Sequence, residues 1–93
     1  MASATCIRLV VHGSVQGVGF RFAACEAASE FSVTGWVRNL PDGSVEIVAQ
    51  GPPDAVARMT SWARRGPRYA AVDRVQIETL AASSELDAFE VRR

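Results

Sequence analysis

The sequence predicts an α+β fold in which two helices pack on one face of an antiparallel sheet. Three observations support this prediction. Segments rich in β-branched residues and segments with helical periodicity follow one another as strand, helix, strand, strand, helix and a final strand unit in two pieces. A Pro-Asp-Gly turn joins the second and third strands. The 93-residue chain is 48% hydrophobic and 22% charged, as is usual for a globular protein.

The first strand, the loop after it and the first helix occupy the N-terminal third of the chain. Segment 5–12 is rich in β-branched residues and stops at Gly13, which predicts a strand. The glycine-punctuated segment 13–19 predicts a loop that leads into a helix over 20–31. Alternation places Ile7, Leu9 and Val11 on the core side of the strand. Helical spacing gives the helix one apolar stripe, formed by Phe20, Ala24, Ala27, Ala28 and Phe31.

A hairpin and a second helix come next. Segments 33–40 and 44–50 have the composition of strands, and Pro41-Asp42-Gly43 predicts the turn between them, because Pro presets φ and Gly supplies φ > 0. The run Gly-Pro-Pro-Asp at 51–54 opens a helix that Gly66-Pro67 ends. The buried face of this helix is expected to contain Val56, Met59 and either Ala63 or Trp62.

Two further strands, over 72–80 and 86–91, close the predicted sheet and are joined by the polar stretch 81–85. The order of elements is that of the ferredoxin-like, split βαβ (βαββαβ) sandwich. A second hydrophobic core would leave each half of the chain below about 50 residues. Residues 1–93 are therefore expected to form a single domain.

Composition and charge exclude several classes of protein. All ten basic residues are Arg, and they balance ten Asp and Glu residues, which disfavours a basic nucleic-acid surface. The Arg preference has two explanations, guanidinium recognition of phosphate or carboxylate and codon bias, and we favour the second for the set as a whole. No apolar run approaches a membrane span of about 20 residues, and the N-terminus lacks the basic and apolar regions of a secretory signal. We therefore expect a cytoplasmic protein.

Few residues suit acid–base or metal chemistry. His12 is the only His, and one His without clustered carboxylates disfavours a transition-metal site. A relay from Ser14 to His12 fits an extended strand, where alternate side chains share a face, but it is weak as a motif. Cys6 and Cys25 are too few for a disulfide framework and lack zinc-type spacing. Both are expected to be reduced and buried, with Cys25 packing in the core.

The run Gly-Ser-Val-Gln-Gly-Val-Gly-Phe-Arg at 13–21 is the first candidate site. Successive backbone N–H groups in a glycine loop and at a helix start can converge on one anion. Arg21 lies in the first helical turn, where the helix dipole disfavours a cation unless an anion binds there. The loop matches neither the P-loop, which needs Lys, nor the G-x-G-x-x-G pattern. From these residues alone, a phosphate cradle and a structural glycine turn with an exposed Arg are equally supported.

Asn39, at the end of the second predicted strand, is the second candidate. Asn is common before a turn, and a neutral carboxamide also suits the holding of a water molecule. We expect the first two strands to lie side by side at the sheet centre, so that Asn39 faces the loop that ends in Arg21. Arg38 alternates to the opposite side, and Trp36 is expected to pack.

These two segments resemble the motifs of the acylphosphatase family. The first motif, a hydrophobic residue followed by x-G-x-V-Q-G-V-x-[FM]-R, is met at residues 11–21. The second begins with Gly-Trp-Val-Arg-Asn at 35–39 and continues with Gly43, Val45 and Gly51. The resemblance extends over nearly the whole chain, and two long motifs at the right separation make it specific.

The resemblance implies a small hydrolase that cleaves acyl phosphates to a carboxylate and inorganic phosphate without a metal or cofactor. By motif position, Arg21 would bind the phosphoryl group and Asn39 would orient the attacking water. The implied backbone cradle consists of Gln16, Gly17, Val18, Gly19 and Phe20. The expected partners are the acyl phosphate substrate and, at the same site, a phosphate or sulfate anion, with no nucleic acid and no membrane. A domain of this size is expected to be a monomer.

Two positions depart from the family pattern. Ser32 follows the first helix where relatives often have Gly, and it costs on the order of 1 kcal/mol if that position needs φ > 0. Gly19 fills a variable motif position and is expected to loosen the loop. Neither change removes a group with an implied catalytic role.

Two other functions fit the same fold. RNA-binding modules of this architecture display aromatic residues on their central strands, and the predicted strand 44–50 has none. The second alternative is a regulatory domain that binds phosphate or an acid without catalysis. The pairing of Arg21 with Asn39 argues against it, because binding alone does not need a residue that orients water.

Overall fold

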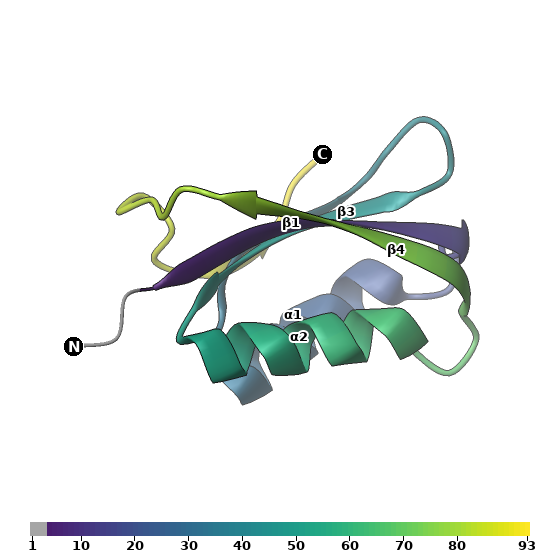
Figure 1. Ribbon diagram of the computed structural model, residues 1–93. Helices are drawn as coiled ribbons and strands as arrows, with labels where there is room; N and C mark the ends of the chain where they lie inside the picture. Colours follow the sequence, from purple (N-terminus) through teal and green to yellow (C-terminus); the bar gives the residue numbers. More distant parts are fainter. Residues whose placement is uncertain (1–3) are drawn as a thin grey trace.

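Both helices lie on the same face of one five-stranded sheet (Figure 1). The computed structural model describes residues 4–93, so residues 1–3, on which part of the argument about a secretory signal rests, lie outside it. Within that range no helix is long and apolar enough to span a bilayer. The elements in chain order are β1 Thr5–Ser14, α1 Phe20–Phe31, β2 Thr34–Asn39, β3 Val45–Gly51, α2 Pro53–Arg65, β4 Ala71–Leu80 and β5 Phe89–Val91. The predicted order of elements is confirmed, and the first helix has the predicted bounds.

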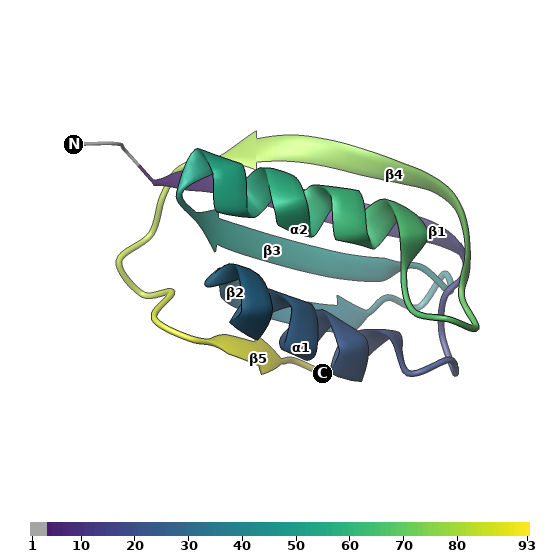
Figure 2. The same cartoon turned by 90° about the horizontal axis from the view of Figure 1, so that it is seen from below.

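The strands lie in the order β4-β1-β3-β2-β5. The expectation that the first and second strands are neighbours is therefore wrong, because β3 lies between β1 and β2 and pairs antiparallel with both. The short turn after β2 brings β3 back against it, while the crossover through α1 leaves one strand position free beside β1. β3 fills that position and becomes the central strand (Figure 2).

The last strand is shorter than predicted and runs parallel to its neighbour β2. Residues 86–88, predicted as strand, belong instead to the connection after β4, which carries the chain from one edge of the sheet to the other. The connection is fixed by hydrogen bonds between the Gln50 side chain and the backbone of Ser83, at 2.9 and 2.8 Å. The other four strands form the predicted antiparallel sheet.

The hydrophobic core lies between the sheet and the two helices. The predicted inward positions of β1 are all buried, and so is the predicted stripe of α1 except for its last residue, Phe31, which is half-buried. In α2 the buried face contains Val56, Met59 and Ala63. Trp62 is half-buried and packs edge-on against Phe20, with 5.2 Å between the ring centroids. This aromatic contact joins the start of α1 to the end of α2.

Ser32 ends α1 in the left-handed conformation, with φ 59° and ψ 47°. The departure from Gly at this position therefore carries the strain anticipated from the sequence, since a residue with Cβ is disfavoured there. The chain turn itself is normal, because the Val33 N–H donates to Ala28 O at 2.9 Å. The helix end thus has its usual hydrogen bond, although Ser32 is strained in the left-handed conformation.

The sheet face away from the helices carries a charged cluster. Glu46 of β3 is buried, and its carboxylate accepts hydrogen bonds from Arg8 of β1 and Arg38 of β2. Burial raises the pKa of Glu46, but the bonds and charges of the two guanidinium groups outweigh it and hold the pKa below its usual value. Arg38 thus points away from the helices, as alternation predicts, and Trp36 packs half-buried beside it, 5.2 Å from the guanidinium carbon to the ring centroid.

Candidate active site

A pocket of about 370 Å³ opens at one end of the sandwich. Figure 2 shows that the loop between β1 and α1 and the turn between β2 and β3 lie at the same end of the sheet. The start of α1, the end of β2 and the end of β5 also contribute to the pocket wall. The lining residues are Val15, Gln16, Gly17, Gly19, Phe20, Arg21, Phe22, Cys25, Asn39 and Val91.

The loop before α1 is held by its valines and shaped by its glycines. Val15 is fully buried and Val18 packs half-buried against the core, so the loop is anchored at two points. Gly17 and Gly19 have φ values of 74° and 77°, and a Cβ at either position would meet nothing within 4 Å. Glycine is therefore needed at these positions for its backbone conformation, not for space. The result is a loop whose backbone is exposed to the pocket.

The start of α1 carries no cap. Gly19 occupies the N-cap position without a side chain, the first turn holds no acidic residue, and the first helical bond runs from Ala23 N–H to Gly19 O at 3.0 Å. The N–H groups before Ala23 therefore lack intrahelical acceptors and form the positive end of the helix dipole. Arg21 adds a full positive charge, is exposed, and forms no ion pair with any residue in 4–93. This arrangement is electrostatically complementary to an anion.

Asn39 reaches the same pocket from β2. It is half-buried and pairs with Val45 at the first step of the hairpin. The predicted turn is present, with Leu40 N–H donating to Ser44 O at 2.9 Å and Gly43 N–H donating to Leu40 O at 3.1 Å. Because β3 separates β1 from β2, Asn39 meets the pocket through α1, which packs against β2, and not through neighbouring strands.

Gln16 links the loop to the hairpin. Its side-chain Nε2 donates to Leu40 O at 2.8 Å and to Ser44 O at 2.9 Å. Gln16 was expected from the sequence to contribute only its backbone, and this side-chain bridge was not predicted. The bridge fixes the glycine loop relative to the strand end that carries Asn39.

The structure brings together all of the predicted site residues except Val18, whose side chain packs against the core. Three lining residues lie outside the two predicted segments, namely Phe22, Cys25 and Val91, and Val15 lies inside the first segment without a predicted role. Cys25 packs against the core, as expected, but it is only half-buried and also faces the pocket. The sequence could have indicated Phe22, because this large apolar residue falls outside the apolar stripe of α1. His12 lies elsewhere, with Nε2 2.6 Å from Gln76 Oε1, so the Ser14–His12 relay is not part of this pocket.

Comparison with known proteins assigns this chain to a family. The family profile described as Acylphosphatase matches residues 7–91 of this chain. The chain belongs to the acylphosphatase family. An acylphosphatase of Nitrosococcus oceani is 49% identical over 88 residues, which cover 95% of this chain and 98% of the relative. An acylphosphatase of Methylococcus capsulatus is 45% identical over 87 residues, covering 94% and 95% of the two chains.

Solved structures agree with this assignment. The structure of an acylphosphatase from Coxiella burnetii superposes with a TM-score of 0.91 at 43% identity and covers 96% of this chain and 93% of its own. An acylphosphatase from Bacillus subtilis gives the same TM-score at 30% identity. The resemblance seen in the two sequence motifs is confirmed, as is the ferredoxin-like fold. Family membership supports an enzyme that hydrolyses acyl phosphates.

Proposed function

We propose that the pocket holds the phosphoryl group of an acyl phosphate on the glycine loop and Arg21, while Asn39 orients the water that attacks phosphorus. The products are a carboxylate and inorganic phosphate. The observation that carries this proposal is that Arg21, the uncapped start of α1 and Asn39 line one pocket. A monomeric, cytoplasmic enzyme remains our prediction, as does a site that also accepts free phosphate or sulfate.

The phosphoryl group suits the donors that surround this pocket. A phosphate dianion presents three terminal oxygens, each of which accepts more than one hydrogen bond. The backbone N–H groups of residues 16–20 and the five N–H donors of Arg21 outnumber these acceptor oxygens. Charge spreads over the same oxygens in the loose transition state of phosphoryl transfer, where fixed donors contribute most. We therefore assign the cradle a role in binding and in rate.

The leaving group explains why the site needs no acid. The bond between phosphorus and the bridging oxygen breaks, and the carboxylate departs with both electrons. Its conjugate acid has a pKa of about 4, by analogy with Asp and Glu, so the departing oxygen needs no proton at neutral pH. The attacking water forms the new bond to phosphorus and passes its proton to a phosphate oxygen. Arg21 stays protonated throughout and acts only as a cation.

Asn39 orients the attacking water without taking up or giving a proton. Its carboxamide has an acceptor oxygen and two donor hydrogens, so it can bind a water molecule in a defined orientation. Fixing the nucleophile near the phosphorus removes much of the entropic cost of attack. Gln16 supports this geometry by holding the hairpin against the loop.

The donor set supports catalysis without a metal. Among residues 4–93 the pocket lining includes neither a carboxylate nor an imidazole, and its one thiol, Cys25, is too few to hold a catalytic Zn²⁺. Arg21 supplies the positive charge that a metal ion would otherwise give to the phosphoryl oxygens. We expect activity to persist in excess EDTA.

The test is the hydrolysis of acetyl phosphate in EDTA by the wild-type protein and by Asn39→Ala. We expect wild-type turnover to be unaffected by the chelator, and Asn39→Ala to lose about 10²–10³ in kcat, as when a positioned catalytic amide is removed. Inorganic phosphate should still inhibit or bind the variant with near-normal affinity. Loss of phosphate binding together with kcat would make Asn39 a ligand or a folding residue, and EDTA-sensitive activity would contradict the metal-free mechanism.

A further inference from the structure

Exposed apolar side chains gather at the pocket. Within the described residues, four large hydrophobic side chains are strongly exposed: Phe22 at 71%, Tyr69 at 74%, Ile77 at 48% and Val91 at 45%. Two of them, Phe22 and Val91, line the same pocket as Arg21. They come from opposite ends of the chain, so their meeting is a result of the fold. Both side chains are therefore open to contact with a ligand that enters this pocket.

The apolar residues of the pocket lining come from α1 and β5, two elements that pack against each other. Phe22 follows Arg21 directly on α1, and Cys25 lies one helical turn further along the same face. Burial raises the pKa of the Cys25 thiol, so this side chain is uncharged at neutral pH. Val91 of β5 completes the set. We call these three residues the apolar wall.

We propose that the apolar wall of Phe22, Cys25 and Val91 binds the acyl group of the substrate, so that the enzyme prefers acyl phosphates with an aromatic or other apolar acyl group. This inference rests on the proposed function, because it takes the glycine loop and Arg21 to be the place of the phosphoryl group. It adds the substrate class, which the sequence motifs leave open.

The connectivity of the substrate supports the placement. In an acyl phosphate, a single bridging oxygen separates phosphorus from the carbonyl carbon, so the acyl group must lie next to the phosphoryl group. Phe22 is the immediate chain neighbour of Arg21, and Arg21 is the one charged residue that the described chain contributes to the pocket lining. An apolar acyl group gains from leaving water against this wall. A charged acyl group would lose hydration there without an ion partner other than Arg21, which the phosphoryl group already occupies.

The experiment compares benzoyl phosphate with acetyl phosphate, which share the reacting end and differ in the acyl group. The readout is the ratio of kcat/KM for benzoyl phosphate to kcat/KM for acetyl phosphate. We expect Phe22→Ala to lower this ratio about tenfold, mainly by raising KM for benzoyl phosphate, because part of the ring surface returns to water. Val91→Ser should lower the ratio in the same direction. Tyr69→Ala is the matched control, since Tyr69 is equally exposed but lies outside the pocket.

Each outcome decides a different point. A ratio that stays at the wild-type value in both Phe22→Ala and Val91→Ser overturns the apolar wall, while hydrolysis of both substrates leaves the proposed function intact. Equal losses with both substrates in Phe22→Ala also overturn it, because the residue would then serve the phosphoryl end. Failure of the wild-type protein to hydrolyse either substrate contradicts the proposed function itself. If Phe22→Ala does not fold, the same kcat/KM ratio is measured for Phe22→Leu and Val91→Ser. The ratio for Phe22→Leu should lie between the wild-type value and that of Val91→Ser.

Discussion

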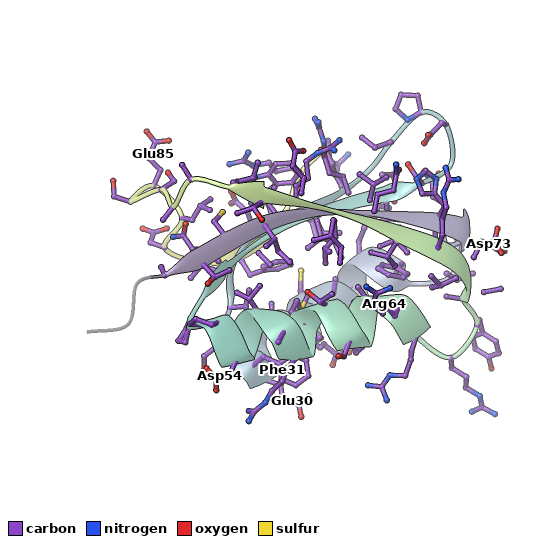
Figure 3. All side chains as sticks on the ribbon, viewed as in Figure 1. Glu30, Phe31, Asp54, Arg64, Asp73 and Glu85 are labelled. Atoms are coloured by element: carbon purple, nitrogen blue, oxygen red, sulfur yellow. The ribbon has the colours of Figure 1, made fainter. Side chains whose placement is uncertain are left out.

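The two helices begin in opposite ways, although they lie side by side on the same sheet. At the start of α2, Pro53 is the first helical residue and Asp54 lies in the first turn, while Arg64 and Arg65 lie in the last turn. Figure 3 shows Asp54 and Arg64 toward opposite ends of α2. Every charge at these ends complements the helix dipole. At the start of α1 there is no acid and no cap, and a cation, Arg21, stands in the first turn.

This difference separates a helix start that stabilises the fold from one that, in our proposal, binds an anion. The ends of α2 follow the local rules, including Gly66 with a positive φ at its C-terminus. The start of α1 breaks these rules, because it lacks a favourable interaction between a negative charge and the helix dipole. A bound anion would supply that interaction. Local rules broken at a pocket are typical of functional sites. The end of α1 breaks a rule as well, at Ser32, but far from the pocket and with no gain that the structure explains.

The largest expected effect comes from removing the positive charge in the first turn of α1. Arg21→Ala should lower kcat/KM by about 10²–10³, because a fixed donor to the phosphoryl oxygens is lost. The same variant should fold more stably by about 0.3–1 kcal/mol at low salt, because a cation leaves the positive end of the helix. The checks are steady-state kinetics with acetyl phosphate and urea unfolding of the ligand-free protein.

Asp54→Ala is the matched control for the other helix. It should lower stability by about 0.3–1 kcal/mol through the same dipole term and leave kcat/KM unchanged. If both variants lost stability, or if Arg21→Ala kept its activity, the two helix starts would not differ in the way described here.

Gln16 gives the next largest effect. Gln16→Met keeps a side chain of similar length but removes both hydrogen bonds to the hairpin carbonyls. We expect kcat to fall about tenfold, since small displacements of positioned groups are costly, with a smaller change in phosphate affinity. Measured kcat and the inhibition constant of inorganic phosphate separate the two effects. A variant with wild-type kcat would show that the bridge serves stability alone.

The smallest effect concerns the end of α1. Ser32→Gly should raise stability by about 1 kcal/mol, because Gly adopts the left-handed conformation without a Cβ penalty. The control is Ser61→Gly inside α2, where the same substitution should lower stability by about 0.5 kcal/mol. Thermal or urea unfolding measures both. No gain at Ser32 would mean that the strain has relaxed elsewhere, and activity should not change in either variant.

Local signals in the sequence predicted most elements, and nonlocal pairing explains what they missed. The turn at Pro41–Gly43 and the bounds of α1 follow from residues adjacent in the chain. The position of β3 between β1 and β2 depends on which strands pair across the sheet, and periodicity carries no information about that. A strand at the C-terminus was predicted, but its parallel pairing with β2 was not, for the same reason.

In the candidate site, too, the residues within local motifs were predicted and those brought together by the fold were not. Arg21, Asn39 and most of the loop were predicted from two motifs, because the groups that we propose to bind the phosphoryl group and to orient the water are concentrated there. Phe22 and Val91 were not predicted, since their shared pocket requires the C-terminal strand to reach the start of α1. The side-chain bridge from Gln16 also depends on a partner more than twenty residues away.

The most direct test of the central claim is a titration of the ligand-free protein with inorganic phosphate, followed by the backbone amide signals in NMR. The account predicts that the amides of residues 16–22 shift and saturate together, with a single affinity. The amides at the start of α2, residues 54–56, should not move. Shifts that are absent from the loop, or that appear equally at both helix starts, would contradict it.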